Sequence, residues 1–192
     1  MQVGKTERVL EGFGPVSKLV LPENWLEHKV PKVSREDIKT LRKFHSPDDI
    51  QIQFCAYYRG LPVSKSSGDL FCRHLTEVSQ VEDEKAILSL QEELQETLGP
   101  LAFKDDFALE KARVKDLNGK RVLEVEGVWP KLNLKSRNIF IDASSDGTIV
   151  YELYYGAPEE EFNGYIETVD NALSSIIWDN DWLTRQNLPE NR

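Results

Sequence analysis

The chain has 192 residues, with 24 Lys and Arg against 33 Asp and Glu, and its formal net charge is −9. Hydrophobic residues make up 40% and charged residues 30%, which is the composition of a globular chain and excludes a disordered one. The length suits one domain with a sizeable core. The acidic surplus argues against duplex nucleic acid or an anionic membrane as the main partner, because both attract basic proteins.

Cysteine content and hydropathy bear on the compartment. Cys55 and Cys72 are too few for a disulfide scaffold, and two inert thiols are typical of a reducing compartment. The N-terminus has no apolar run of the kind that forms a signal-peptide core. No stretch approaches the roughly 18 apolar residues of a membrane-spanning helix. We therefore expect a cytoplasmic protein with no membrane span.

The first third of the chain predicts an arm followed by strands. Residues 1–16 carry glycines and a proline and are expected to be irregular, and residues 17–22 form a short apolar strand. Ser34 and Asp37 resemble a capping box for a short helix. Residues 50–57 alternate between apolar and polar side chains, which predicts a half-buried antiparallel strand. Leu41–His45 is its expected hairpin partner.

Two helices are predicted next. Apolar residues recur at helical spacing between residues 70 and 78. Ser79 and Glu82 form a second candidate capping box, which opens a helix that ends before Gly99-Pro100.

From about Leu109 the pattern predicts strands. Asn118-Gly119 is a strong hairpin signal, and Ser145-Asp146-Gly147 joins two further strands, which gives a four-stranded antiparallel meander. Glu124 and Glu126 are expected on a solvated patch of one of these strands.

The last element is predicted to be the longest helix, from Pro158 to Trp178. Glu159, Glu160 and Glu161 are expected in its first turn, where carboxylates suit the positive end of the helix dipole. The element order predicts an α+β fold in which helices flank an antiparallel sheet. We expect one domain over residues 17–178 and a polar C-terminal tail over residues 179–192.

No motif predicts a catalytic, cofactor or metal site. Gly4-Lys5-Thr6 lacks the first glycine of a phosphate-binding loop. The three histidines, at 28, 45 and 74, are too widely spaced for a local zinc motif, so a metal site requires tertiary convergence. A Cys–His nucleophile pair is conceivable, but its local signature is missing.

Three aromatic residues are the candidate partner-binding side chains. Trp182 lies in a polar setting beyond the last predicted helix, where it either packs back onto the domain or serves as an interface anchor. Tyr151, Tyr154 and Tyr155 span both faces of one strand, so at least one of them is expected to face outward and contribute to a binding surface. Tyr154 and Tyr155 are the candidates.

The sequence resembles the PsbP-like and DcrB-like family of α/β/α sandwiches, which includes the Ran-binding Mog proteins. The stretches that carry the resemblance are Leu21-Pro22-Glu23-Asn24-Trp25, the hairpin of residues 41–45 and 50–57, and the ending made of residues 147–153, 157–162 and 176–178. The resemblance implies a mostly non-enzymatic role, since members bind a GTPase, attach to a photosynthetic complex or act as chaperone-like accessory factors. It carries no binding residue over to this chain.

Two functions therefore compete. The leading hypothesis is a non-catalytic protein-binding or accessory module with a protein partner and no cofactor. The alternative is a small-ligand protein or enzyme whose site is assembled in the tertiary structure. A nucleic-acid binder would need more basic residues than the nearest cluster of Lys131, Lys135 and Arg137 supplies.

Overall fold

The computed structural model describes residues 7–28, 39–60, 65–77, 80–81, 83–98, 107–182 and 184. The strands of the N-terminal half are β1 (Glu7–Phe13), β2 (Val16–Pro22), β3 (Leu26–His28), β4 (Lys39–His45), β5 (Gln53–Gly60) and β6 (Gln80–Val81). Those of the C-terminal half are β7 (Ala108–Leu117), β8 (Lys120–Trp129), β9 (Leu134–Asp142), β10 (Val150–Pro158) and β11 (Ile177–Trp178). The helices are α1 (Lys65–Glu77), α2 (Glu84–Leu98) and α3 (Ile166–Ser174), with short 3₁₀ turns at Pro130–Leu132 and Phe162–Tyr165.

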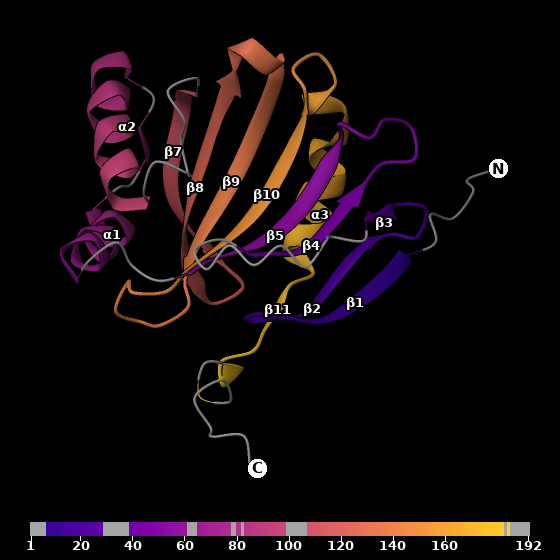
Figure 1. The fold of residues 1–192 in the computed structure, drawn as a ribbon, viewed down its shortest axis with the longest axis horizontal. Coiled ribbons are helices and arrows are strands. Elements are labelled where there is room, and N and C mark those ends of the chain that lie inside the picture. The colour runs from indigo at the N-terminus through magenta and orange to yellow at the C-terminus, as the bar shows by residue number, and fades with distance from the viewer. Residues whose placement is uncertain are drawn as a thin grey trace.

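A large antiparallel sheet lies between two layers. Its order is β3-β4-β5-β10-β9-β8-β7-β6, and a second sheet has the order β1-β2-β11 (Figure 1). Phe140 packs with α1 and α2 residues in one apolar cluster, whereas its neighbours Ile139 and Ile141 pack with α3 and the small sheet in another. Because successive strand residues point to opposite faces, these clusters lie on opposite faces of the large sheet. The predicted α+β fold is confirmed.

The predicted meander is confirmed as β7-β8-β9-β10. Asn118 and Gly119 have φ values of 52° and 85°, the left-handed conformation that a tight hairpin requires. The Asn118 side chain also donates to the carbonyl oxygen of Ile176 at 2.7 Å, and so fixes the chain after α3 against the β7–β8 turn.

The β4–β5 hairpin is also confirmed, with Phe44 paired to Phe54. The strand begins at Gln53, however, and not at residue 50. Asp49 accepts main-chain hydrogen bonds from Gln51 and Ile52 in a turn, and this turn leaves Ile50 exposed.

The predicted irregular arm over residues 1–16 is wrong for residues 7–13, which form β1 and pair antiparallel with β2. Gly14 and Pro15 are the hairpin turn between the two strands. Gly14 has a φ of +64°, and a Cβ atom there would lie 2.3 Å from the ring of Tyr151. The glycine is therefore required both by backbone conformation and by a close approach to the core.

The predicted helix over residues 158–178 is wrong at both ends, and its first turn is a 3₁₀ turn. Pro158 ends β10, the three glutamates at 159–161 lie in a turn, and α3 spans only Ile166–Ser174 before the chain enters β11. The glutamates therefore do not occupy the first turn of a helix, and the helix dipole does not explain them.

The start of α2 is also corrected. Asp83 accepts a hydrogen bond from the main-chain nitrogen of Ala86 at 3.1 Å and so caps the helix, whereas Gln80 and Val81 pair with β7 as the short strand β6. The predicted caps at Ser34 and Ser79 and the Gly4-Lys5-Thr6 segment lie outside the described residues. Within the described residues, no helix is long and apolar enough to cross a bilayer.

Candidate functional site

The outer face of the small sheet carries a row of apolar side chains. Val9 on β1 pairs with Val20 on β2, and Ile177 on β11 pairs with Lys18, two residues from Val20. Paired residues of antiparallel strands point to the same face, so Val9 and Val20 lie side by side, and Lys18 and Ile177 lie on the same face beside them. Val9 is 50% and Ile177 53% exposed, whereas Leu10 and Leu19 on the opposite face are buried. The small sheet therefore packs one face on the core and presents the other to solvent.

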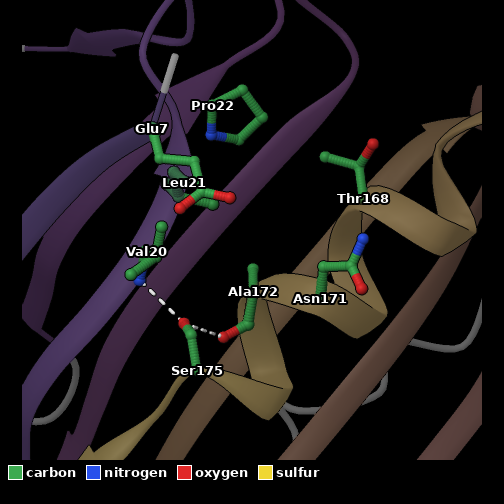
Figure 2. A pocket seen from close by; sticks show the side chains of 8 residues that line it. All are labelled: Glu7, Val20, Leu21, Pro22, Thr168, Asn171, Ala172 and Ser175. Carbon is green, nitrogen blue, oxygen red and sulfur yellow. Dashed lines mark hydrogen bonds between the residues drawn. The ribbon is translucent and has the colours of Figure 1, made fainter. Parts of the chain in front are cut away.

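A small pocket lies beside this row, between β2 and α3. It has a volume of about 160 Å³ and is lined by Glu7, Val20, Leu21, Pro22, Thr168, Asn171, Ala172 and Ser175. Figure 2 shows the Glu7 side chain leaning over β2 from one side, with Thr168 and Asn171 on the other. Pockets for drug-sized ligands measure roughly 300–1,000 Å³, so this one suits a single side chain better than a metabolite.

The pocket is closed at one end by a hydrogen-bond relay. The Val20 main-chain nitrogen donates to Ser175 Oγ at 2.8 Å, and Ser175 Oγ donates to the Ala172 carbonyl oxygen at 2.6 Å (Figure 2). The relay satisfies a strand-edge nitrogen that β11 does not reach. It also shows that the Val20 main-chain nitrogen points away from β1.

Charges surround the apolar row unevenly. Glu11 on β1 lies opposite Lys18 on β2, but Glu7 lies opposite Pro22, which carries no charge. No described residue forms an ion pair with Glu7. The surface is therefore apolar at its centre and acidic at the Glu7 end.

Buried charges of the meander form a separate network. Glu124 on β8 is 1% exposed, and it accepts hydrogen bonds from Arg113 Nε at 2.6 Å and from Lys115. Arg137 on β9 donates to Glu126 at 2.8 Å and to Asp170 of α3 at 2.6 Å. The predicted solvated patch at Glu124 and Glu126 is therefore wrong, because the carboxylates pair with cations on the neighbouring strands.

The network shifts the pKa values of its members. Burial alone would raise the pKa of Glu124, but the charges of Lys115, Arg137 and Arg113 hold it below its ordinary value. Burial opposes the charge of Arg137 as well, yet Glu126 and Glu124 raise the Arg137 pKa. Each group is thus held in its charged form, and the network joins α3 to the sheet.

A row of polar side chains runs along the other face of the same strands. Trp129 Nε1 donates to Ser136 Oγ at 3.0 Å, Ser136 Oγ donates to Asn138 Oδ1 at 2.9 Å, and Asn138 Nδ2 donates to Glu152 Oε1 at 2.6 Å. Ser136, Asn138 and Glu152 are buried, so the row satisfies polar groups inside the protein.

Neither cysteine has the environment of a nucleophile. Cys55 is fully buried on β5, and burial raises the pKa of its thiol to about 11. Burial also raises the pKa of the Cys72 thiol, as does the nearby carboxylate of Asp142, to which it donates a hydrogen bond at 3.8 Å. A reactive cysteine needs the opposite shift, toward the thiolate.

The histidines do not converge on a metal site in the described residues. His28 and His45 lie close together, with ring centroids 4.4 Å apart, but His74 lies on α1 and faces Glu93 of α2. Among the residues that the structure describes, no group of three or more His, Cys, Asp or Glu side chains could hold a metal ion.

The structure separates the three predicted partner-binding residues. Tyr155 is 1% exposed and its hydroxyl donates to the Phe162 carbonyl oxygen at 2.7 Å, so its prediction as a surface contact is wrong. Tyr154 is half-buried on the other face of β10, edge-to-face with Tyr57. Trp182 is half-buried just after β11, in a segment that the Asp179 nitrogen joins to the Pro15 carbonyl oxygen at 2.8 Å.

Sequence reasoning missed the apolar row. Val9 lies in the predicted irregular arm, and Ile177 lies in the predicted helix over residues 158–178. Residues 7–11 (Glu-Arg-Val-Leu-Glu) show no apolar–polar alternation, so the local sequence does not reveal that Val9 is exposed and Leu10 buried. Nothing local indicates that β1, β2 and β11 share one sheet.

Comparisons with known proteins bear on the fold alone. The chain matches no protein-family model and has no significant sequence match among curated proteins. It is similar in structure to cyanobacterial PsbP (CyanoP) from Synechocystis, with 13% identity, a TM-score of 0.57 and coverage of 93% of this chain and 96% of that one. It also resembles LpqN of Mycobacterium tuberculosis, which is involved in cell envelope biogenesis, with 14% identity, a TM-score of 0.46 and 90% of each chain covered.

The likeness to CyanoP agrees with the element order described above. An antiparallel sheet with α1 and α2 on one face and α3 on the other is an α/β/α sandwich. The chain has the PsbP-like fold.

Proposed function

We propose that this protein is a non-catalytic accessory module that binds another protein through the outer face of the β1-β2-β11 sheet. The observation that carries the proposal is the apolar row made of the exposed Val9 and Ile177 and the partly buried Val20. Apolar side chains gathered on one sheet face and bordered by charges are typical of protein interfaces. The PsbP-like fold supports an accessory role, since the family that the sequence resembles is mostly non-enzymatic.

The adjoining pocket supports a protein partner over a metabolite. Its volume of about 160 Å³ accommodates one inserted side chain, and its lining continues the apolar row through Val20 and Pro22. An apolar centre beside a pocket that accepts an anchor side chain is how interface hot spots are built.

The cytoplasmic location expected from the sequence is part of the same proposal. Cys55 and Cys72 are both free thiols, and this state suits a reducing compartment. Fractionation of source cells, followed by immunodetection of this chain, tests the location directly.

Affinity capture with matched variants tests the binding role. The double variant V9S/I177S removes the exposed apolar groups from the surface. The control L132S removes a side chain that is 61% exposed in the 3₁₀ turn after β8, outside the surface. We expect proteins captured from an extract of the source organism by the unmodified chain and by L132S to be lost with V9S/I177S. Identical capture by all three would contradict the proposal.

Trp182→Ala tests whether the predicted anchor belongs to the same interface. Trp182 follows β11 and is half-buried, so an interface role predicts weaker capture with little change in thermal stability. A clear fall in the melting temperature would instead assign Trp182 to the folded core.

A further inference from the structure

We infer that the partner adds a strand to the open edge of β1, and that this strand reads basic–x–apolar–x–basic. The inference rests on the proposed function and names the kind of partner that the surface takes. It follows from three observations: the free edge of β1, the residues that β1 presents there, and the charge that these residues carry.

The edge of β1 is open in the described structure. β1 ends its sheet, whose order is β1-β2-β11. The Val20 main-chain nitrogen points to Ser175 on the far side of β2, so the pair Val9–Val20 is one of those that exchange no main-chain hydrogen bonds. The N–H and C=O groups of Val9 therefore point outward, away from β2. By the same alternation, those of Glu7 and Glu11 also point outward.

The three outward-bonding residues also place their side chains on the outer face. Glu7, Val9 and Glu11 stand at positions i, i+2 and i+4 of β1, and each is exposed. A strand hydrogen-bonded to this edge would place its own alternate side chains directly beside them, on the same face. Main-chain bonds would supply part of the affinity and the alternate side chains the specificity, as in other strand-addition complexes.

The charges on β1 determine which residues the added strand must carry. An apolar residue beside Val9 extends the apolar row, and a basic residue beside each glutamate forms a cross-strand ion pair. Glu7 has no cation opposite it in the sheet, and its side chain leans toward Leu21 (Figure 2), so the residue beside it needs the length of Lys or Arg.

A second copy of the chain is disfavoured at this edge. Antiparallel self-pairing centred on Val9 places Glu7 of one copy beside Glu11 of the other. Parallel self-pairing places like glutamates side by side. Like charges directly opposite one another destabilise strand pairing, and edge charges commonly prevent such self-association.

Synthetic peptides test the inference on the full chain. The probe is acetyl-Thr-Lys-Thr-Val-Thr-Lys-Thr-amide, whose symmetric pattern places lysines beside both glutamates in either strand direction. One control peptide has Glu in place of both lysines, and another carries an N-methyl group on the central Val, which removes its hydrogen-bond donor. We expect the Lys peptide to bind at least about tenfold more tightly than either control. The Glu peptide exchanges two ion pairs for two repulsions, and the N-methyl peptide loses a main-chain hydrogen bond to β1.

Hydrogen exchange identifies the bound strand. Binding at the β1 edge slows exchange of the Val9 amide, which points outward, and leaves the Leu10 amide unchanged, because it already points toward β2. Equal affinity for the Lys and Glu peptides, or an unprotected Val9 amide, would overturn the inference.

Charge reversal supplies the matched variants. E7K/E11K is expected to reverse the preference and bind the Glu peptide, whereas E159K/E160K, with the same charge change in an exposed turn, keeps the preference for Lys. If V9S/I177S loses its captured proteins while no peptide protects Val9, the proposed function stands and strand addition at β1 fails.

Discussion

Two pairs of glutamates, each pair on one face of its strand, lie in very different surroundings in this molecule. Glu124 and Glu126 stand in the middle of the large sheet, where β7 and β9 bring Arg113 and Arg137 beside them. Glu7 and Glu11 stand on β1, which pairs only with β2 among the described strands. The central pair is paired with cations inside the protein, whereas the edge pair is exposed: Glu11 lies opposite Lys18, and Glu7 lies opposite the uncharged Pro22. In the proposed complex, the edge pair binds the basic residues of the added strand. The position of a strand in its sheet thus decides what an alternating glutamate does.

Removing a cation from the central network should cost the most stability. Arg137→Met leaves Glu126 and the buried Glu124 without one of their partners, and breaking a buried ion pair from one side costs about 3–5 kcal/mol. Chemical denaturation measures the loss. Arg121→Met on the exposed side of β8 is the control and should change stability by less than about 0.5 kcal/mol. Equal effects of the two substitutions would show that the network does not stabilise the sheet.

The β1–β2 turn connects the small sheet to the core, and substitutions there should cause a smaller loss of stability. Gly14→Ala adds a Cβ atom that meets the Tyr151 ring and also strains a positive φ, so a loss of about 2–3 kcal/mol is expected. Gly12→Ala, at a φ of +66° with no atom within 4 Å of the added carbon, carries the backbone strain alone and should cost about 1 kcal/mol. Thermal unfolding of both variants isolates the Tyr151 contact, and equal losses would exclude it.

Local chemistry made part of this fold predictable. Asn118-Gly119 predicts its hairpin because both residues must adopt a positive φ, and no distant contact is needed to know it. The predicted helix over 158–178 extends too far because Ile176 and Ile177 continue the helical period of Phe162, Tyr165 and Val169. Helix α3 ends at Ser174, and Ile177 lies in β11. Periodicity reports which side chains are buried, and not which hydrogen bonds the backbone makes.

The candidate site depends on contacts between distant parts of the chain. Val9 and Ile177 lie near opposite ends of the sequence, and only the pairing of β2 with both β1 and β11 places them on one face. The burial of Glu124 cannot be predicted from the sequence for the same reason, because the cations that pair with it, Arg113 and Lys115, lie on the neighbouring strand β7. In the sequence, a glutamate next to apolar residues looks the same in the central strand β8 as in the edge strand β1. Only the strand order distinguishes the two.

Protonation should weaken the contact between α1 and α2. His74 is buried, and burial lowers its pKa, with Arg73 lowering it further and Glu93 and Glu77 opposing. His74 therefore binds a proton more readily in the unfolded chain than in the folded one. The stability contributed by neutral His74 is present above its unfolded pKa of about 6.5 and is lost as the pH falls through the lower folded value.

Denaturation midpoints between about pH 7.5 and pH 5 should decline for the unmodified chain and decline less for His74→Gln. Glu93→Gln removes the carboxylate 3.8 Å from His74 Nε2 and should steepen the decline. If His74→Gln leaves the pH profile unchanged, His74 does not control the acid sensitivity of this helix pair.

The smallest effect on stability is expected at the edge strand, where the largest effect on binding is proposed. Val9→Ser truncates a side chain that is half exposed, and such substitutions change stability by less than about 0.5 kcal/mol. The same substitution at the buried Val125 of β8 removes apolar contacts and leaves a hydroxyl inside the sheet, which costs about 2–3 kcal/mol. Thermal unfolding should therefore separate the two valines, whereas capture of a partner should fail with Val9→Ser and persist with Val125→Ser at temperatures where that variant is folded. A large loss of stability from Val9→Ser would place Val9 in the core and remove the main support for a binding surface on this sheet.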